Sequence, residues 1–237
     1  MEHDIRETII NSYSDIALGR RRSCGCSEDE GWKEETTGAG PVERELNLGC
    51  GTPLDFADLA PGQTVLDLGS GSGREVFLAA RIVGERGRAL GLDMTPAMID
   101  LARANAAAIG CRNATFIPGD IMNMPLGTGT VDRVISNCVI NLTTDKEKSF
   151  AEIHRVLRDG GRFAIADIVS TDPLPKKMRR DPKLWCDCVA GALPVGEYLA
   201  AIGKAGFRDV SVVSRRSDTS CDRPGLGLLS ITVTGTK

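Results

Sequence analysis

Short apolar runs rich in β-branched residues alternate with longer amphipathic stretches from Thr64 onward. This alternation is typical of strands joined by crossover helices in a parallel sheet. Two late runs, DVSVVSR (209–215) and LLSITVTG (228–235), predict an antiparallel pair because only a short loop separates them. The earlier expected strands are TVLDLG (64–69), ALGLDM (89–94), ATFIPGD (114–120), DRVISN (132–137) and RFAIADI (162–168). The pattern therefore predicts an α/β fold.

The stretch between the second and third expected strands has the signals of a helix at both ends. Thr95 is a good N-cap, and Pro96 suits the first helical position. Gly110 follows the last turn and ends the helix. A helix is therefore expected over TPAMIDLARANAAAIG.

A further helix is expected after the fourth strand. Thr144 and Glu147 fit a capping box, and Gly160-Gly161 is expected to end the helix. The apolar positions between these signals are Phe150, Ile153, Val156 and Leu157.

The first ~60 residues do not follow this alternation, because they lack its period. Residues 4–18 resemble an amphipathic helix. The segment Arg20 to Pro53 is rich in Gly, Cys and charge without a clear period. We expect it to be a long loop that closes over a site.

Composition and charge narrow the choice of partners. The chain has 237 residues, 41% of them hydrophobic, which suits one large domain. Its 29 basic and 32 acidic residues give a net charge of -3, so no basic field is expected for nucleic acid or a membrane surface. No apolar stretch approaches the ~20 residues of a membrane span, and MEHDIRETII does not resemble a signal peptide. We therefore expect a cytoplasmic protein that acts on a small molecule.

The chain has eight cysteines, and thiols are normally kept reduced in the cytoplasm. A framework of structural disulfides is therefore a poor explanation. A structural zinc site is also disfavoured, because the close pairs Cys24/Cys26 and Cys186/Cys188 have one intervening residue instead of two to four. A lone cysteine is more often a small buried hydrophobe, which suits Cys111 best.

The segment VLDLGSGSGREV combines a strand, a tight glycine turn and a helix start. A dinucleotide fingerprint requires its third glycine one place later than Gly73, at the position of Arg74. Asp67 directly precedes the turn, and a carboxylate there would repel a pyrophosphate. The turn therefore favours a ligand with an amino group or a sulfonium.

The pattern Asp-x-Gly-x-Gly-x-Gly resembles motif I of the class I S-adenosylmethionine-dependent methyltransferases, and the resemblance extends over about residues 64–170. It implies a Rossmann-like fold with a seven-stranded, mostly parallel sheet, one antiparallel strand and helices on both faces. It also implies that Asp67, Gly69 and Gly71 line the methionine and ribose part of the cofactor.

Carboxylates at further strand ends extend this resemblance. Asp93 is expected to accept both ribose hydroxyls, a role that also follows from its position about 20 residues past the turn. Asp120, with Ile121 beside it, is expected at the adenine amino group. The other residues expected at the cofactor are Ser70, Gly73, Arg74, Met94 and Asn137.

Cysteines follow the same edge of the expected sheet. ISNC places Cys138 at the end of the fourth strand, where it should lie beside the transferable methyl group. Cys50 precedes the sheet in NLGCGTPL, and Cys186 and Cys188 follow the fifth strand in LWCDCVAGAL. Soft thiolates select soft, thiophilic ions.

These stretches together resemble the arsenite methyltransferases, which transfer methyl groups from S-adenosylmethionine to trivalent arsenic. The matching segments are LGCG (48–51), DLGSGSGR (67–74), GLDMT (91–95), SNCVINL (136–142) and the stretch from Cys188 to Leu193. The resemblance implies that Cys50, Cys138 and Cys188 bind arsenic(III). Cys188 matches in preference to Cys186 because Gly191-Ala192-Leu193 fixes the alignment.

The family usually has another cysteine in the amino-terminal loop, which is proposed to form a disulfide with the equivalent of Cys50. Cys24 and Cys26 are both candidates here, with Cys24 slightly favoured. Cys221 has no motif, and it is either a packing residue or an accessory thiol.

The resemblance further implies arsenite and methylarsenite as substrates, detoxification of arsenic as the role, and a thioredoxin or glutathione system as reductant. Residues 1–60 would cover the site, residues 61–237 would form the methyltransferase domain, and an arsenic-binding insertion would lie around 172–195. The protein is expected to be a monomer.

Arsenic bound to three sulfurs keeps a lone pair that can attack a methyl group held about 3 to 3.5 Å away. No general base is then required, in agreement with a chain whose only histidines are His3 and His154. Three alternatives stay open: a quinone- or sterol-type C- or O-methyltransferase, a protein that sequesters metalloids without turnover, and a zinc-stabilised fold.

Overall fold

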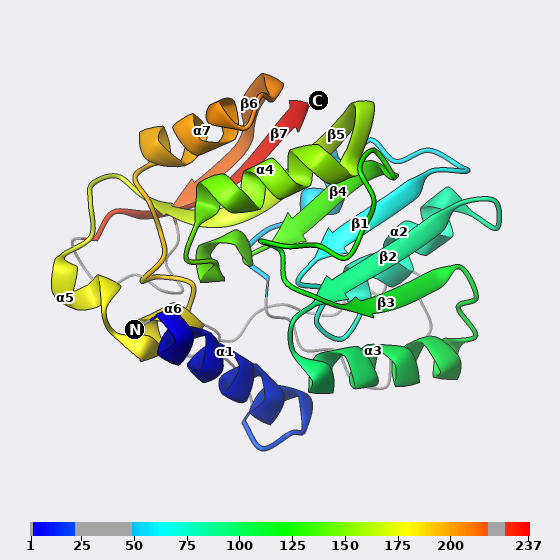
Figure 1. The fold of residues 1–237 in the computed structure, drawn as a ribbon, viewed down its shortest axis with the longest axis horizontal. Helices are drawn as coiled ribbons and strands as arrows, with labels where there is room; N and C mark the ends of the chain where they lie inside the picture. The colour runs from blue at the N-terminus through cyan, green and yellow to red at the C-terminus, as the bar shows by residue number, and fades with distance from the viewer. Residues whose placement is uncertain (1, 22–48, 218–225) are drawn as a thin grey trace.

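A computed structural model describes residues 2–21, 49–217 and 226–237 (Figure 1). Seven strands form one sheet in the order β3-β2-β1-β4-β5-β7-β6. The strands are β1 (Thr64–Leu68), β2 (Arg88–Asp93), β3 (Ala114–Pro118), β4 (Val131–Asn137), β5 (Leu157–Ser170), β6 (Arg208–Ser217) and β7 (Leu228–Thr236). All pairings are parallel except those of β7 with β5 and β6. The predicted sheet, with one antiparallel strand, is confirmed.

The direction of the chain across the sheet reverses between β1 and β4. From β1 the chain continues outward through β2 to β3, and it then returns to β4 on the other side of β1. Ligands of open α/β sheets bind at the carboxyl ends of strands where the order reverses in this way. The glycine turn after β1 and Cys138 after β4 both lie at this reversal point.

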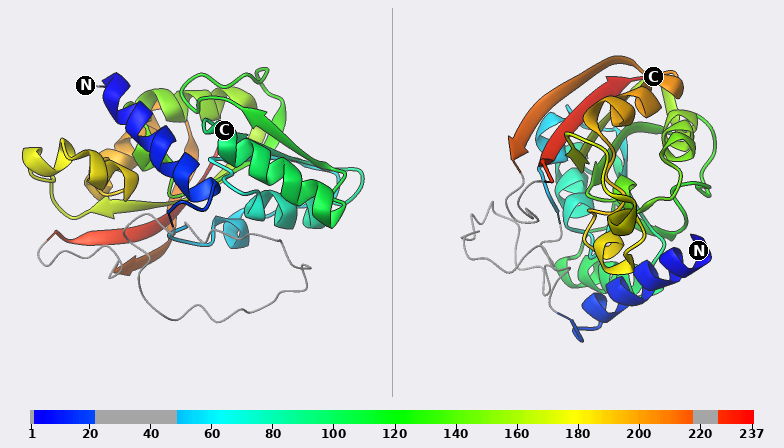
Figure 2. Two further views of the ribbon diagram at one scale, coloured as in Figure 1. Left: turned by 90° about the horizontal axis from the view of Figure 1, so that it is seen from below. Right: turned by 90° about the vertical axis from the view of Figure 1, so that its left-hand side faces the viewer.

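Helices cover both faces of the sheet, as predicted (Figures 1 and 2). Successive residues of a strand point to opposite faces, so Val134 packs with α4 (Lys146–Val156) and α7 (Val195–Lys204). Ile135 packs with α2 (Arg74–Val83) and α3 (Pro96–Ile109) on the other face.

Five further helical elements complete the described fold. They are α1 (Glu2–Ala17), η1 (Pro53–Phe56), η2 (Ile140–Leu142), α5 (Lys176–Arg179) and α6 (Pro182–Cys186). The expected amino-terminal helix is therefore present, and it lies beside α3 and α6 (Figures 1 and 2). Ile9 and Ile16 of α1 are buried in these contacts. Most of the loop expected over residues 20–53 lies outside the described residues.

The two helix-end predictions had different outcomes. α3 begins after Thr95 with Pro96 at its first turn and ends at Gly110 in the left-handed region, as expected, although the Thr95 side chain makes no capping hydrogen bond. The capping box at Thr144 is wrong. Asp145 is the N-cap of α4, and its carboxylate accepts a hydrogen bond from the Lys148 N–H at 2.9 Å.

The predicted end of the same helix at Gly160-Gly161 is also wrong. α4 ends at Val156, and β5 begins at the next residue. Leu157 already pairs with Val131 of β4, so strand pairing replaces the last helical turns. Glu147, expected to cap the helix, forms an exposed ion pair with Lys204 of α7 at 2.7 Å.

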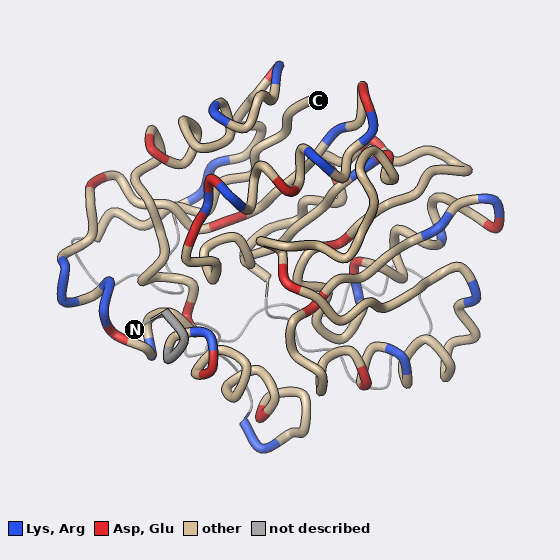
Figure 3. The backbone as a smooth tube through the Cα atoms, in the orientation of Figure 1, with Lys and Arg blue, Asp and Glu red and all other residues tan. Residues whose placement is uncertain are grey.

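In the described part of the chain, no helix is long and apolar enough to span a membrane. Acidic and basic positions occur throughout the backbone trace, and acidic positions are found at the carboxyl ends of central strands (Figure 3).

The loop after α6 predicts a sharp difference between two glycine substitutions. A Cβ at Gly191 would overlap the main-chain carbonyl of Asn141, whereas a Cβ at Gly203 in α7 meets nothing within 4 Å. We expect Gly191→Ala to destabilise the protein by roughly 3 kcal/mol, as overpacking does. Gly203→Ala should stabilise it by up to about 1 kcal/mol, because alanine loses less entropy in a helix.

Urea unfolding of both variants and the wild type measures these free energies. Equal stability of the two variants would contradict the close approach of Gly191 to Asn141.

Candidate functional site

Three glycines shape the turn after β1. Gly69, Gly71 and Gly73 have φ values of 67°, 50° and 96°, in the left-handed region that glycine adopts without strain. The side chain of Val139 lies where a Cβ of Gly69 would project, so the turn packs directly against the loop after β4. Among the described residues, nothing lies within 4 Å of the Cβ position at Gly71. The turn is therefore open to a ligand at Gly71.

Two carboxylates border this turn: Asp67 is buried, and Asp93 is half-buried. Asp93 accepts hydrogen bonds from the N–H groups of Gly71 at 3.0 Å and Thr95 at 2.8 Å. Burial raises the pKa of Asp67 well above its ordinary value, and the charges of Glu75 and Asp93 raise it further. Burial also raises the pKa of Asp93, although its hydrogen bonds oppose this effect. A cationic or hydroxyl-bearing ligand would relieve this accumulation of negative charge.

Asp120, the third expected carboxylate, already has partners. One oxygen accepts a hydrogen bond from the Arg6 guanidinium of α1 at 2.6 Å, and the other accepts from the Met122 N–H at 2.8 Å. α1 therefore reaches the position at which the adenine is expected. The adenine-binding role of Asp120 stays a prediction.

The other residues expected at the cofactor occupy different surroundings. Ile121 packs in the main core, and the exposed Arg74 lies 3.9 Å from the Glu75 carboxylate. Met94 packs against the apolar cluster that contains the cysteines. The Ser70 hydroxyl is buried and has no hydrogen-bond partner among the described residues. The Ser70 hydroxyl lies beside Gly91 of β2, so a direct contact of Ser70 with the cofactor stays a prediction.

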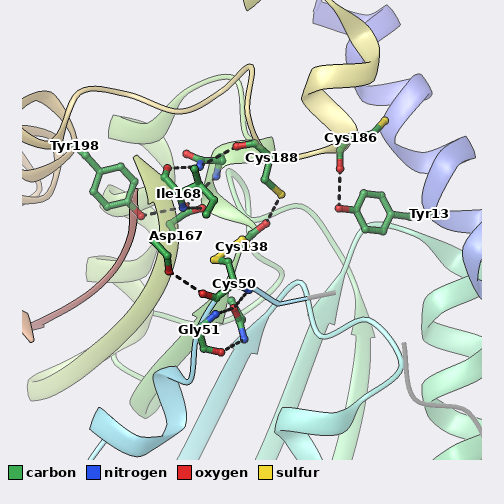
Figure 4. The surroundings of a disulfide bond; sticks show 12 residues. Tyr13, Cys50, Gly51, Cys138, Asp167, Ile168, Cys186, Cys188 and Tyr198 are labelled. Atoms are coloured by element: carbon green, nitrogen blue, oxygen red, sulfur yellow. Dashed lines mark hydrogen bonds between the residues drawn. A yellow bond between two sulfur atoms is a disulfide. The ribbon is translucent and has the colours of Figure 1, made fainter. Parts of the chain in front are cut away.

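Cys50 and Cys138 are joined by a disulfide, with their Cα atoms 5.8 Å apart (Figure 4). The Asn137 amide oxygen accepts hydrogen bonds from the N–H groups of Cys50 at 2.9 Å and Gly51 at 3.2 Å. Its amide nitrogen donates to the Gly51 carbonyl at 2.7 Å, and the Ser230 hydroxyl donates to the Cys50 carbonyl at 2.7 Å. The Asn137 side chain thus holds the Cys50 loop, and its expected contact with the cofactor stays a prediction.

This pairing differs from the one that the family resemblance implied. Cys50 was expected to pair with Cys24 or Cys26, and it is bonded here to Cys138. Cys24, Cys26 and Cys221 lie outside the described residues. In the state that the structure holds, Cys50 and Cys138 are not free thiols.

Of the two cysteines after β5, Cys188 is the one that faces Cys138. The Cys188 thiol donates a hydrogen bond to the Cys138 carbonyl at 2.9 Å, and both residues are buried. The Cys186 thiol contacts α1 near the Thr8 carbonyl at 4.0 Å, and the Cys186 carbonyl accepts from the Tyr13 hydroxyl at 3.3 Å. Figure 4 shows the two sulfur atoms pointing in different directions.

Both facing cysteines have unusual backbone conformations. Cys138 and Cys188 have φ values of 60° and 58°, which few residues other than glycine adopt. Such conformations cost on the order of 1–3 kcal/mol and persist where the surroundings hold them. The Cys138 N–H donates to the main-chain carbonyl of Ala166 in β5 at 2.8 Å. The Cys188 N–H donates to the main-chain carbonyl of Trp185 in α6 at 3.0 Å. Strain of this kind gathers at functional sites.

A buried polar cluster lies behind Cys188, and the sequence analysis missed it. The Asn141 side-chain amide donates to the carbonyls of Ile168 at 2.5 Å and Cys188 at 3.2 Å. The Asn141 N–H donates to the Asp167 carboxylate at 3.1 Å, and its carbonyl accepts from the Lys146 ammonium at 3.1 Å. The sequence signal for this cluster was Asn141, a polar residue between the apolar residues Ile140 and Leu142. A buried polar side chain in such a position is expected to have hydrogen-bond partners.

The cluster contains two buried groups of opposite charge. Burial raises the pKa of Asp167 to about 7, although the nearby Lys146 opposes this shift. Burial lowers the pKa of Lys146 to about 8, and the charges of Asp167 and Cys188 oppose the shift. The Tyr198 hydroxyl donates to Asp167 at 3.2 Å, and the Lys146 ammonium lies 5.3 Å from the centre of the Trp185 ring. Each charge is therefore held by several partners.

His154 and Cys111, for which no role in the site was expected, have structural surroundings. His154 packs against the Phe207 ring at 5.1 Å between centroids, and Cys111 is a partly buried residue that packs against the α2/α3 face of the core. In residues 2–21, 49–217 and 226–237, no group of three or more His, Cys, Asp or Glu side chains is placed to hold a metal ion.

Comparisons with known proteins agree with this architecture. Residues 59–211 match the model of a methyltransferase domain. The chain is 41% identical over 236 residues to an arsenite methyltransferase of Halobacterium salinarum, with 91% of this chain and 60% of that protein aligned. It is 36% identical over 178 residues to the human arsenite methyltransferase, with 70% of this chain and 47% of that protein aligned. The chain thus spans less than two thirds of the length of these relatives.

A solved structure shares both the fold and part of the sequence. The arsenic(III) S-adenosylmethionine methyltransferase of Chlamydomonas reinhardtii superposes with a TM-score of 0.70 at 34% identity. The superposition covers 82% of this chain and 68% of that chain. With the strand order, the glycine turn and the three cysteines of the family motifs in place, this chain belongs to the arsenite S-adenosylmethionine methyltransferase family.

Proposed function

We propose that the protein transfers methyl groups from S-adenosylmethionine to arsenite and methylarsenite bound by Cys50, Cys138 and Cys188. One observation carries this proposal: the three cysteines meet at the carboxyl end of β4, directly beside the glycine turn that follows β1. A methyl donor in the turn and a thiophilic acceptor on the cysteines would thus be neighbours.

The residues around the turn suit S-adenosylmethionine. Its amino group and sulfonium are cations that would offset the buried charge of Asp67, and its ribose hydroxyls can donate to Asp93. The open space beside Gly71 would admit the ligand. When bound, S-adenosylmethionine supplies an electrophilic methyl group on a positively charged sulfur.

The cysteines must be reduced before they can bind arsenic. A dithiol such as thioredoxin, or two molecules of glutathione, would supply the two electrons that convert the Cys50–Cys138 disulfide to two thiols. Each arsenic–sulfur bond then forms as one As–OH bond breaks, and the hydroxide leaves as water with the thiol proton. Arsenite, which has three hydroxyls, would make three such exchanges and bind Cys50, Cys138 and Cys188. Methylarsenite, which has two hydroxyls, would make two exchanges and bind two of these cysteines. The arsenic lone pair is retained in both cases.

The redox balance of methyl transfer gives the disulfide a place in the cycle. The As–C bond would form from the lone pair as the methyl–sulfur bond of S-adenosylmethionine breaks and S-adenosylhomocysteine leaves, which oxidises arsenic from the trivalent to the pentavalent state. The As–S bonds to Cys50 and Cys138 would then break as the two sulfurs form a disulfide, which returns two electrons to arsenic, and the two residues are close enough for this bond. Water would supply the hydroxyl that replaces the lost sulfur ligands and would release one proton. The thiol reductant would then restore both thiols, and repeated cycles would detoxify arsenic by methylation.

The activity assay is the first test. Reduced protein with arsenite and methyl-labelled S-adenosylmethionine should produce labelled methylarsenicals, separated and quantified by arsenic species. Cys138→Ser should lower the rate on both arsenite and methylarsenite by on the order of 100-fold or more, because it removes an arsenic ligand and an electron donor together.

Cys186→Ser is the matched control, because this buried thiol contacts α1 and points away from Cys138. It should retain the activity of the wild type within about threefold. Bound arsenite without labelled product, in protein that binds the cofactor, would favour sequestration of the metalloid. Wild-type turnover by Cys138→Ser would remove Cys138 from the arsenic site.

The raised pKa of Asp67 predicts that replacing this carboxylate would stabilise the ligand-free protein but weaken cofactor binding. Its folded pKa lies above the ordinary 3.8, so the folded state binds the proton more tightly than the unfolded state. The wild type therefore loses stability as the pH rises from about 4 through the folded pKa. Asp67→Asn removes this loss, and it should stabilise the ligand-free protein at pH 7 by on the order of 1 kcal/mol.

The same substitution should weaken S-adenosylmethionine binding by about tenfold or more, because a charge partner is lost. Unfolding by urea from pH 4 to 8, together with calorimetric titration, measures both effects. Asp93→Ala should also weaken cofactor binding, but it should destabilise the protein because it leaves the Gly71 and Thr95 N–H groups without their acceptor. Unchanged cofactor affinity in Asp67→Asn would exclude Asp67 from the cofactor site.

A further inference from the structure

We propose that Asn141 is a positioning residue for Cys188: its side-chain amide holds the left-handed backbone of Cys188 so that the thiol stays beside Cys138. This proposal rests on the proposed role of Cys188 in binding arsenic, and it identifies what keeps that ligand in place.

Both protons of the Asn141 amide are used on main-chain carbonyls. One is donated to Ile168 of β5 at 2.5 Å and the other to Cys188 at 3.2 Å. Both acceptors are carbonyl oxygens, so only the NH₂ end of the amide can face them. Asn141 therefore ties the Cys188 turn to the central sheet.

Asn141 is itself fixed by its main chain. Its N–H donates to Asp167 at 3.1 Å, and its carbonyl accepts from Lys146 at 3.1 Å. Gly191 packs directly against the same carbonyl, and Asn141 has no exposed surface. A side chain that starts from so rigid a base can determine the place of its hydrogen-bond partners.

The same segment links Asn141 to the second thiol. Asn141 lies in η2, three residues after Cys138 in the chain, and its amide reaches the residue whose thiol donates to the Cys138 carbonyl. Cys138 and Cys188 are 50 residues apart in the sequence, so contacts across the fold must set their spacing. Asn141 supplies such a contact from one thiol-bearing segment to the other.

The strained backbone of Cys188 explains why a hydrogen bond from Asn141 is required to hold it. Cys188 has a φ of 58°, and a β-carbon makes this conformation unfavourable without external support. If the amide is removed, the peptide at Cys188 can relax toward an ordinary φ, and the thiol would turn away from Cys138. A ligand displaced by about 1 Å contributes much less to a shared site.

A double-mutant cycle tests this role. Arsenite affinity of the reduced full-length protein is measured by titration of thiolate–arsenic absorbance in the wild type, Asn141→Ala, Cys188→Ser and the double variant. We expect Asn141→Ala to weaken arsenite binding by about tenfold or more in the wild-type background. In the Cys188→Ser background it should change the affinity less than about twofold, because the ligand that it positions is already absent.

Asn113→Ala is the matched control. The Asn113 amide also donates to two main-chain carbonyls, those of Ala80 at 2.8 Å and Gly84 at 3.0 Å. Its oxygen accepts from the Cys111 thiol at 3.6 Å, but among the described residues it has no hydrogen bond to the three proposed arsenic-binding cysteines. It should leave arsenite affinity unchanged. S-adenosylmethionine affinity and the urea midpoint of each variant identify a general loss of structure.

If Asn141→Ala does not fold, Asn141→Ser takes its place in the cycle. A serine hydroxyl can serve only one of the two carbonyls, so a smaller loss that still depends on Cys188 is expected. An equal loss of affinity with and without Cys188 would overturn the positioning role. Equal arsenite affinity of the wild type and Cys188→Ser would instead overturn the proposed arsenic site itself.

Discussion

The parallel pairing of β1 with β4 is the constraint on which the rest of the site depends. The register places Asp67 opposite Ile135 and Leu68 opposite Ser136, so the two strands end level with each other. The glycine turn after β1 and the cysteine loop after β4 consequently emerge side by side, and Val139 fills the space beside Gly69. A side chain at this glycine would push the two loops apart.

Different functional groups lie on the two sides of the β1/β4 pair. The carboxylates of Asp67 and Asp93 lie on the side of β1 and β2, where a positively charged methyl donor would be stabilised. Thiols and their supporting polar groups lie on the side of β4 and β5. Asp67 and Asp93 thus lie on one side of this pair of strands and the cysteines on the other, with the Asp167 carboxylate behind Cys188 in the same polar cluster as Asn141.

The regular elements could be predicted from the sequence because their signals are local. β1 to β5 carry their own apolar patterns, and the ends of α3 carry Pro96 and Gly110. The start of α4 was misplaced by one residue because Thr144 and Asp145 are both good caps, and only the hydrogen bond to Lys148 distinguishes them. Its end was misplaced because the pairing of Leu157 with β4 is a tertiary contact.

The site was predictable only in part, for the same reason. Family motifs drew attention to Cys50, Cys138 and Cys188, whose role stays a prediction, but neither the Cys50–Cys138 disulfide nor the Asn141 amide could be inferred from spacing. The two acceptors of that amide are 27 and 47 residues further along the chain. No local pattern encodes hydrogen bonds over such separations. The role of Asn141 in holding the Cys188 segment can therefore be seen only in the fold, where its two acceptors lie together.

The helix α1 packs beside α3 and α6, and two kinds of contact hold it there. Its apolar residues Ile9 and Ile16 are 1% and 0% exposed, whereas the Arg6 side chain that reaches Asp120 is 48% exposed. Exposed ion pairs contribute only about 0–1 kcal/mol, so the attachment of α1 depends on its apolar face. Asp120 can therefore exchange Arg6 for a ligand at little cost, while α1 stays in place beside α3 and α6.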